Sequence, residues 1–216
     1  MELFDKTMEK QRALSQTLAS LPMQDFIAEA LKNLNKSAGH WEGRVRPLND
    51  SGEPIVNSKK LPEELAEFYR FCDGFEAVQG EFPASIYRLS ELRLGADYTP
   101  SLSELLFSHW NAYGNDSDKP AHLSIFPPDN LLALATNNAQ CYLKPSLVDA
   151  ALSILPPAQD GFVVILLEDS GPYLPYGTVL EIEGGIATQH KNFKTWLSDR
   201  ASLFGFLDSL HSSIRT

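Results

Sequence analysis

The sequence carries two pairs of neighbouring carboxylates, at Glu168-Asp169 and at Glu181/Glu183. Residues two apart in a β-strand point to the same face, so Glu181 and Glu183 should lie opposite Ile182. Glycosidases need two carboxylates that face each other across a substrate cleft, and a side-by-side pair on one strand does not fit that chemistry. The Glu181/Glu183 pair fits an acidic patch that binds a partner, or the solvent face of a half-buried hairpin, and both interpretations stay open.

Motifs for nucleophilic, metal or phosphate chemistry are missing from the sequence. There is no G-x-S-x-G elbow, and Ser170-Gly171 has the composition of a turn. Asp116-Ser117-Asp118 resembles the start of a calcium loop, but the required glycine and distal glutamate are missing. No HxxxH pair, P-loop or G-x-G-x-x-G is present. The five histidines are isolated in sequence: His40, His109, His122, His190 and His211. We therefore expect no enzymatic activity, no metal site and no cofactor.

Two tyrosines and a leucine are held between prolines in the segment Pro172-Tyr173-Leu174-Pro175-Tyr176. Such side chains bury apolar area with little conformational entropy to lose, which is the composition of an interaction hot spot. The competing interpretation is that they fold back over the edge of the core. For a partner-binding surface we expect five residues: Asp169, Tyr173, Tyr176, Glu181 and Glu183.

The charge of the chain is acidic and unevenly distributed. The formal net charge is −10, yet residues 1–60 hold 9 basic and 8 acidic residues, whereas residues 61–216 hold 9 and 20. Such an excess of acid repels phosphate backbones and anionic lipid and attracts a basic partner. We therefore expect no direct nucleic-acid binding and no membrane binding. Solubility alone also explains an acidic composition, so the charge permits a protein partner without requiring one.

Apolar runs and cysteines predict a cytoplasmic protein. The longest runs, such as Phe162 to Leu167, are far shorter than the ~20 residues of a membrane span. The first residues mix acids with bases and lack the apolar core of an export signal. The two cysteines, Cys72 and Cys141, lack the CxxC spacing of a metal or redox site, and we expect both to be buried thiols.

Helical periodicity dominates the start of the chain. An i, i+3, i+4 apolar pattern predicts two helices between Phe4 and Leu34, with a break near Ser20 to Pro22. Glycines and prolines interrupt the polar stretch from Asn35 to Lys60, which we interpret as a loop or irregular linker. Residues 1–60 are accordingly expected to form an N-terminal helical extension and linker.

A third helix should begin at Leu61-Pro62-Glu63-Glu64, where proline occupies the first turn and acids complement the helix dipole. This helix should stop at Gly74. From Phe82 to Leu92 we expect an extended or short helical passage. Ser101 and Glu104 have capping-box spacing and predict a further helix.

The second half changes to the period of β-strands. Short apolar runs predict antiparallel strands at His122–Phe126, Leu131–Thr136 and Gln140–Leu143. The continuous apolar run Phe162–Leu167 suits a central strand, and Gly184-Gly185 joins Thr178–Glu183 to Ile186–Gln189 in a hairpin. We expect helices at Ser146–Leu155 and Phe193–Leu210. Together these elements predict an α+β fold with helices packed on a mostly antiparallel sheet.

Several of these segments resemble the SUKH superfamily. LPEELAEFYRFCDGFE, Leu61 to Glu76, resembles its signature helix, and Ile86 to Leu92 is similar to the short segment that follows that helix. GFVVILLED, YGTVLEIEGG and Asn192 to Leu197 resemble its closing strands and terminal helix. The matches span roughly residues 61–200, so we expect residues 61–216 to form one compact SUKH-like domain.

The resemblance implies a function in protein binding. Many bacterial members are immunity proteins that neutralise toxins, and a fungal member regulates cell-wall signalling. The resemblance thus implies a non-catalytic module whose partner is a cognate toxin. The alternative is an intracellular scaffold or regulatory protein with a cellular partner, and an unrecognised hydrolase is the third hypothesis.

Overall fold

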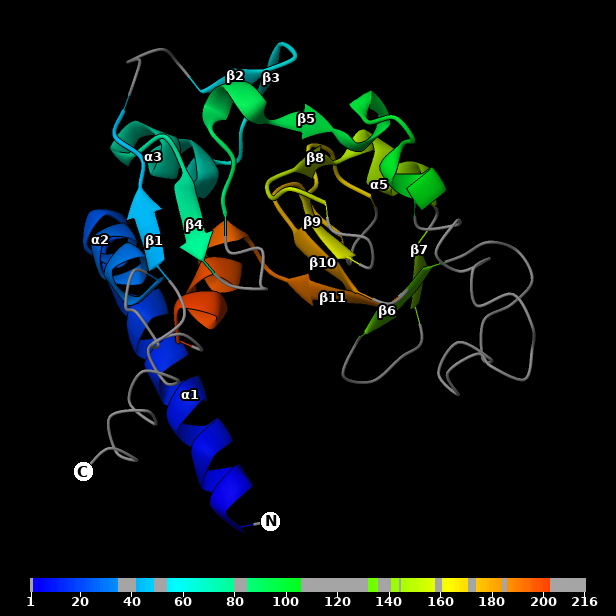
Figure 1. The fold of residues 1–216 in the computed structure, drawn as a ribbon. Helices are drawn as coiled ribbons and strands as arrows, with labels where there is room; N and C mark the ends of the chain where they lie inside the picture. The colour runs from blue at the N-terminus through cyan, green and yellow to red at the C-terminus, as the bar shows by residue number, and fades with distance from the viewer. Residues whose placement is uncertain are drawn as a thin grey trace. The chain divides into compact units, whose positions relative to one another are not determined.

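The computed structural model divides the chain into two compact units (Figure 1). The helical unit comprises Met1–Ile55, Leu61–Ser90 and Asn192–Thr216, and the sheet unit comprises Val56–Lys60 and Glu91–Lys191. The described residues are 2–34, 42–48, 54–79, 85–105, 132–135, 141–143, 145–157, 161–170, 174–183 and 186–202. The helical unit therefore combines segments from both sides of the domain boundary expected at residue 60.

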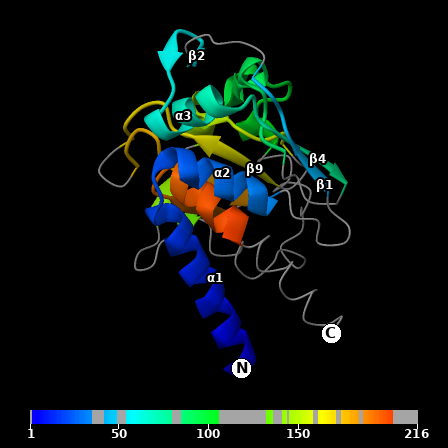
Figure 2. The same cartoon turned by 90° about the vertical axis from the view of Figure 1, so that its left-hand side faces the viewer.

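Helices supply most of the described part of the helical unit. They are α1 (Glu2–Ser20), α2 (Met23–Leu34), α3 (Glu63–Phe71) and a helix over residues 193–202. The two N-terminal helices, the break between them and the third helix are confirmed. α2 packs against α1 and α3, and Figure 2 shows it beside the helix of residues 193–202. None of the described helices is both long and apolar enough to cross a lipid bilayer.

Buried aromatic rings form the centre of the helical unit. The rings of Phe68 and Phe193 meet edge-on with centroids 5.2 Å apart, and Trp196 lies 5.7 Å from Phe193. Pairs in such geometry contribute about 0.5–1.5 kcal/mol beyond their buried area. The Ser198 hydroxyl donates a 2.6 Å hydrogen bond to the Ser15 carbonyl, which ties the same helix to α1.

A small sheet in the helical unit corrects one prediction. β1 (Glu42–Val45) pairs antiparallel with β4 (Phe75–Gln79). The expectation that Asn35 to Lys60 is only loop or linker is therefore wrong for residues 42–45, and for the hairpin described below. β1 has four residues and contains Gly43, so its own sequence carries little strand signal. Its partner β4 lies beyond α3, so no neighbouring turn indicates the pairing either.

The turn from α3 into β4 requires glycine. α3 ends at Phe71, just before the expected stop, and Gly74 has φ +94°, which residues with a Cβ rarely adopt. A Cβ at Gly74 would lie 2.5 Å from the carbonyl oxygen of Tyr87. Phe75 and Ile86 exchange backbone hydrogen bonds of 3.1 and 2.8 Å directly after this turn. The close approach of these two segments therefore depends on the absence of a side chain.

A seven-stranded sheet forms the core of the sheet unit. Its order is β5-β8-β9-β10-β11-β6-β7, and all pairings are antiparallel except that of β11 with β6. The strands are β5 (Arg93–Leu94), β6 (Leu132–Ala135), β7 (Cys141–Leu143), β8 (Leu152–Ser153), β9 (Gly161–Ile165), β10 (Val179–Glu183) and β11 (Ile186–His190). The predicted α+β class and mostly antiparallel sheet are thus confirmed.

The hairpin of β10 and β11 has the predicted two-residue connection. Glu183 pairs with Ile186, so only Gly184-Gly185 lie between the strands. β9 lies on the other side of β10 and inside the sheet, as expected for a continuous apolar run. Buried side chains of both strands contribute to one apolar cluster: Phe162, Val164, Leu180 and Ile182.

The helix predicted for Ser146–Leu155 is only half correct. α5 (Pro145–Ala150) ends early, and the next residues form β8, which pairs with β9. Leu152 and Ile154 are both fully buried. A short run of apolar residues shows no alternation with polar ones, whether it forms a buried helix or a central strand. Hydrophobic periodicity therefore could not distinguish a helix from a strand at residues 151–155.

A second hairpin joins β2 (Ile55–Val56) to β3 (Lys59–Lys60). Its turn residues have positive φ, 50° at Asn57 and 64° at Ser58. Positive φ at both central residues is typical of the type I′ turn, whose twist matches that of paired strands, and asparagine tolerates it well.

The remaining predictions concern short segments. η1 (Leu89–Glu91) is a single 3₁₀ turn, consistent with the short helical passage expected up to Leu92, and η2 (Gly95–Asp97) is a second such turn beyond it. The capping box is confirmed, because the Ser101 amide donates to Glu104 and the Glu104 amide donates to Ser101. Three predictions lie outside the described residues: the strand at 122–126, the helix beyond residue 105 and the C-terminal helix beyond residue 202.

Replacing Gly74 tests the turn before β4. Gly74→Ala should lower the free energy of unfolding by about 1–3 kcal/mol, because it combines a positive φ with a backbone clash. Urea denaturation measures the change. Ser90→Ala, at an exposed position of the same unit, should leave the midpoint unchanged. Equal midpoints for Gly74→Ala and the natural protein would show that the turn does not require glycine.

Cys72 should make stability depend on alkaline pH. The thiol is buried as predicted, and burial is the main cause that raises its pKa from 9.0 to about 11. Between these values the folded state retains a proton that the unfolded state releases, so stability falls as the pH rises. The stability advantage over Cys72→Ala should shrink by up to about 1.4 kcal/mol per pH unit in this window. Urea unfolding of both proteins from about pH 8 to pH 10.5 measures it, and a constant difference would contradict a buried thiol.

Candidate partner-binding surface

The loop between β9 and β10 is closed by an extension of the strand ladder. The Leu166 amide donates to the Thr178 carbonyl, and the Gly177 amide donates to the Leu166 carbonyl, both at 2.9 Å. Gly177 has φ 83°, which allows the chain to turn back into β10 at this point. The two ends of the loop are therefore held together at one rung of the sheet.

Leu174 folds inward from this loop. Its side chain is buried in the apolar cluster that includes Val164 and Leu180. The Ser170 amide donates a 2.8 Å hydrogen bond to the Leu174 carbonyl and closes the loop on itself. For Leu174, the interpretation that the side chain folds over the core edge is thus the correct one, and this burial fixes the chain two residues before Tyr176.

Tyr176, in contrast, is exposed but held in place. The residue is 42 % exposed. Its backbone amide donates a 2.7 Å hydrogen bond to Asp169 Oδ1, and its hydroxyl donates a 2.8 Å hydrogen bond to the Lys60 carbonyl. Asp169 is itself exposed. An aromatic ring is therefore presented to solvent in one orientation, with a carboxylate hydrogen-bonded to its backbone.

An ion pair connects the β2–β3 hairpin to the loop between β9 and β10. Lys59 Nζ donates to Glu168 Oε1 at 2.7 Å, and this hydrogen bond, with the lysine charge, holds the pKa of Glu168 below its ordinary value. Both side chains are open to solvent, so the pair orients the hairpin more than it stabilises the fold. The loop–hairpin surface defined by these contacts consists of Lys59, Lys60, Glu168, Asp169 and Tyr176.

The predicted acidic pair on β10 lies apart from this surface. Glu181 Oε2 is 3.4 Å from His190 Nε2 on β11, and their side chains are only 17 % and 11 % exposed. Glu181 therefore presents little acid to solvent. Glu183 lies at the far end of β10, next to the Gly184-Gly185 turn, and its side chain is outside the described residues.

The structure thus brings together two of the five expected site residues. Asp169 and Tyr176 are hydrogen-bonded, whereas Tyr173 lies outside the described part of the chain. Sequence reasoning missed Lys59 and Lys60, because their segment was interpreted as linker. The available signal was a two-residue turn beginning with asparagine between two short runs, which is typical of a hairpin.

The loop–hairpin surface combines an aromatic group with charges of both signs. It offers an aromatic ring, two carboxylates and two lysines, a mixture that suits a polar interface with an aromatic anchor. Among the described residues, no three His, Cys, Asp or Glu side chains gather in an arrangement that could hold a metal ion. The buried Cys72 belongs to the other unit.

Comparisons with family models, with curated proteins and with solved structures find no match to this chain. The resemblance to the SUKH superfamily therefore rests on the segments quoted above, chiefly Leu61 to Glu76 and the closing strands. The geometry of the loop–hairpin surface, in which Tyr176 is exposed and held by two hydrogen bonds, does not depend on that resemblance.

Removing the Tyr176 hydroxyl tests whether it holds the hairpin. Tyr176→Phe should raise hydrogen exchange at residues 55–60 several-fold while lowering global stability by at most about 1 kcal/mol, because one exposed hydrogen bond is lost. Tyr69→Phe is a matched control, since it removes an equally long bond to the Tyr87 carbonyl in the other unit. Exchange at residues 55–60 that responds equally to both variants would contradict the local anchor.

Proposed function

We propose that this protein is a non-catalytic binding module that docks on a cognate protein toxin and neutralises it. The observation that carries the proposal is the exposed ring of Tyr176, held by hydrogen bonds to Asp169 and Lys60. The toxin as partner is supported by the resemblance to SUKH immunity proteins, which is carried by residues such as Leu61 to Glu76.

Preorganisation is the energetic reason for choosing this surface. Ordering a flexible side chain on binding costs about 0.5–1.5 kcal/mol, and hot-spot aromatic residues contribute 2 kcal/mol or more. Because hydrogen bonds to Asp169 and to the Lys60 carbonyl already hold Tyr176, much of this ordering cost is met for that side chain in the free protein. The Tyr176 ring can therefore add its contact area to the affinity with a small entropic loss.

Charge supports a basic partner. Residues 61–216 carry 20 acidic and 9 basic residues, which favours rapid association with a positively charged surface. If the toxin is a nuclease, its phosphate-binding groove has that charge, and the exposed Asp169 carboxylate can occupy a phosphate position. Such a protein inhibits the toxin by occupying its substrate groove, and it needs no catalytic residues of its own.

Affinity capture of the full chain, with the products of neighbouring genes co-expressed, tests the proposal. We expect stoichiometric recovery of one neighbour that is toxic alone and harmless when this protein is present. Tyr176→Ala should weaken that complex roughly tenfold or more, while costing the free protein only about 1 kcal/mol of stability, because it removes one exposed hydrogen bond and a partly exposed ring. Val45→Ala, also at an exposed apolar side chain, is the matched control and should leave the affinity unchanged.

The other outcomes are equally informative. Recovery of a housekeeping complex that depends on Tyr176 would replace the toxin with a cellular partner and favour the scaffold or regulator. A toxin complex that is indifferent to Tyr176→Ala would keep the immunity function and overturn the loop–hairpin surface as its site. Recovery of no protein would count against the function itself.

A further inference from the structure

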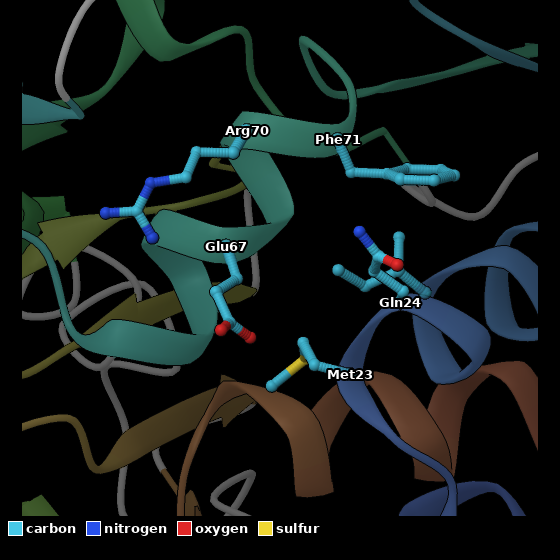
Figure 3. Close-up of a pocket in the computed structure, with 6 residues that line it drawn as sticks. Met23, Gln24, Glu67, Arg70 and Phe71 are labelled. Atoms are coloured by element: carbon cyan, nitrogen blue, oxygen red, sulfur yellow. The ribbon is translucent and has the colours of Figure 1, made fainter.

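The helical unit contains a surface groove between α2 and α3 (Figure 3). Its volume is about 220 Å³. The lining residues are Met23, Gln24, Ile27, Glu67, Arg70 and Phe71. The groove shares no residue with the loop–hairpin surface, which belongs to the other unit.

An exposed aromatic ring forms one wall of the groove. Phe71 is 43 % exposed, and Figure 3 shows its ring over Gln24 of α2. The buried side chains of α3 include Leu65, Phe68 and Tyr69, so the core does not use Phe71. Ile27, which also lines the groove, is buried. The groove therefore offers apolar contact area that the fold itself leaves open.

A carboxylate without a partner stands beside this apolar area. Figure 3 shows the Glu67 carboxylate pointing from α3 toward Met23, whereas the Arg70 guanidinium points away from the other lining residues. No hydrogen bond or ion pair joins Glu67 to another of the described residues. A cation placed in the groove would meet this carboxylate next to a sulfur atom and an aromatic ring, both of which also favour the long aliphatic stems of lysine and arginine.

Size and charge identify the occupant. The groove is smaller than the roughly 300–1,000 Å³ of pockets that enclose drug-sized ligands, so it suits one or two side chains of a peptide. α2 and α3 together carry five acidic and two basic residues, and one of the bases, Lys32, is paired with Glu29 at 3.0 Å. Of the two charged residues that line the groove, Glu67 is turned toward the other lining residues and Arg70 points away from them (Figure 3), so the local field favours a positively charged segment.

We propose that the α2–α3 groove docks a short segment of a partner protein in which a lysine or arginine neighbours a large apolar side chain. The basic group pairs with Glu67, and the apolar side chain packs on Phe71 and Met23. This goes beyond the function proposed above, because the groove is a separate surface in a separate unit. It holds whether the partner of the loop–hairpin surface is a toxin or another protein.

Selection of a random short-peptide library displayed on phage, against the full-length protein, tests this inference. We expect enriched peptides with a lysine or arginine beside an apolar residue. For a synthetic enriched peptide, Glu67→Gln should weaken binding about fivefold, as for one solvent-accessible ion pair. Phe71→Ala should weaken it about tenfold through lost apolar contact.

Matched variants make each outcome decisive. Glu9→Gln removes an exposed carboxylate on α1, Leu48→Ala removes an apolar side chain that is 47 % exposed, and both should bind the peptide normally. Tyr176→Ala should also bind normally, which separates this inference from the function proposed above. Enrichment of acidic peptides, binding that survives both groove variants, or no enrichment would overturn the proposal. Self-association of the protein that Phe71→Ala abolishes would overturn it too, by assigning the groove to a second copy.

Discussion

The antiparallel pairing of β9 with β10 is the constraint on which the described part of the sheet unit depends. It brings Val164 opposite Leu180 in a fully buried layer, and it continues as far as Leu166 and Thr178. Loss of this register by one residue would turn the buried faces outward, so the register is strongly specified. Because the register also determines where the two ends of the next loop meet, the position of Tyr176 follows from the packing of residues that never contact solvent.

The helical unit depends on a different kind of contact. Its aromatic rings come from α3 and from the helix of residues 193–202, and a backbone close approach at Gly74 sets the path between α3 and β4. The groove between α2 and α3 is a by-product of this arrangement. α3 turns Phe68 and Tyr69 into the core, and the next residues along the helix, Arg70 and Phe71, necessarily point outward. The same helix therefore stabilises the core with one face and leaves the apolar ring of Phe71 exposed on the other.

Sequence reasoning succeeded where local patterns decide the structure. The apolar stripes of α1, α2 and α3 and the glycine pair before Ile186 each predict their element without help from distant residues. It failed for β1, whose partner lies beyond α3, because strand pairing over such a distance leaves no trace in a four-residue segment. The site shows the same division. Period two placed Glu181 on the face opposite the core residue Ile182, but it could not predict that Glu181 is only 17 % exposed and lies 3.4 Å from His190 of the next strand. Phe71 was overlooked because a search for an apolar stripe discards the residues outside the stripe.

The helical unit is assembled from segments at opposite ends of the chain. Ser15 and Ser198 touch across nearly the whole length of the sequence, and Phe193 completes a ring cluster begun by Phe68. On the ribosome, which adds about 5–20 residues per second, α1 to α3 must therefore wait for the last part of the sequence before their core can close. The described strands of the sheet unit are all synthesised before that point. During synthesis the sheet can form first, while the parts of α2 and α3 that the helix of residues 193–202 covers, such as the rings of Phe26 and Phe68, stay uncovered for many seconds.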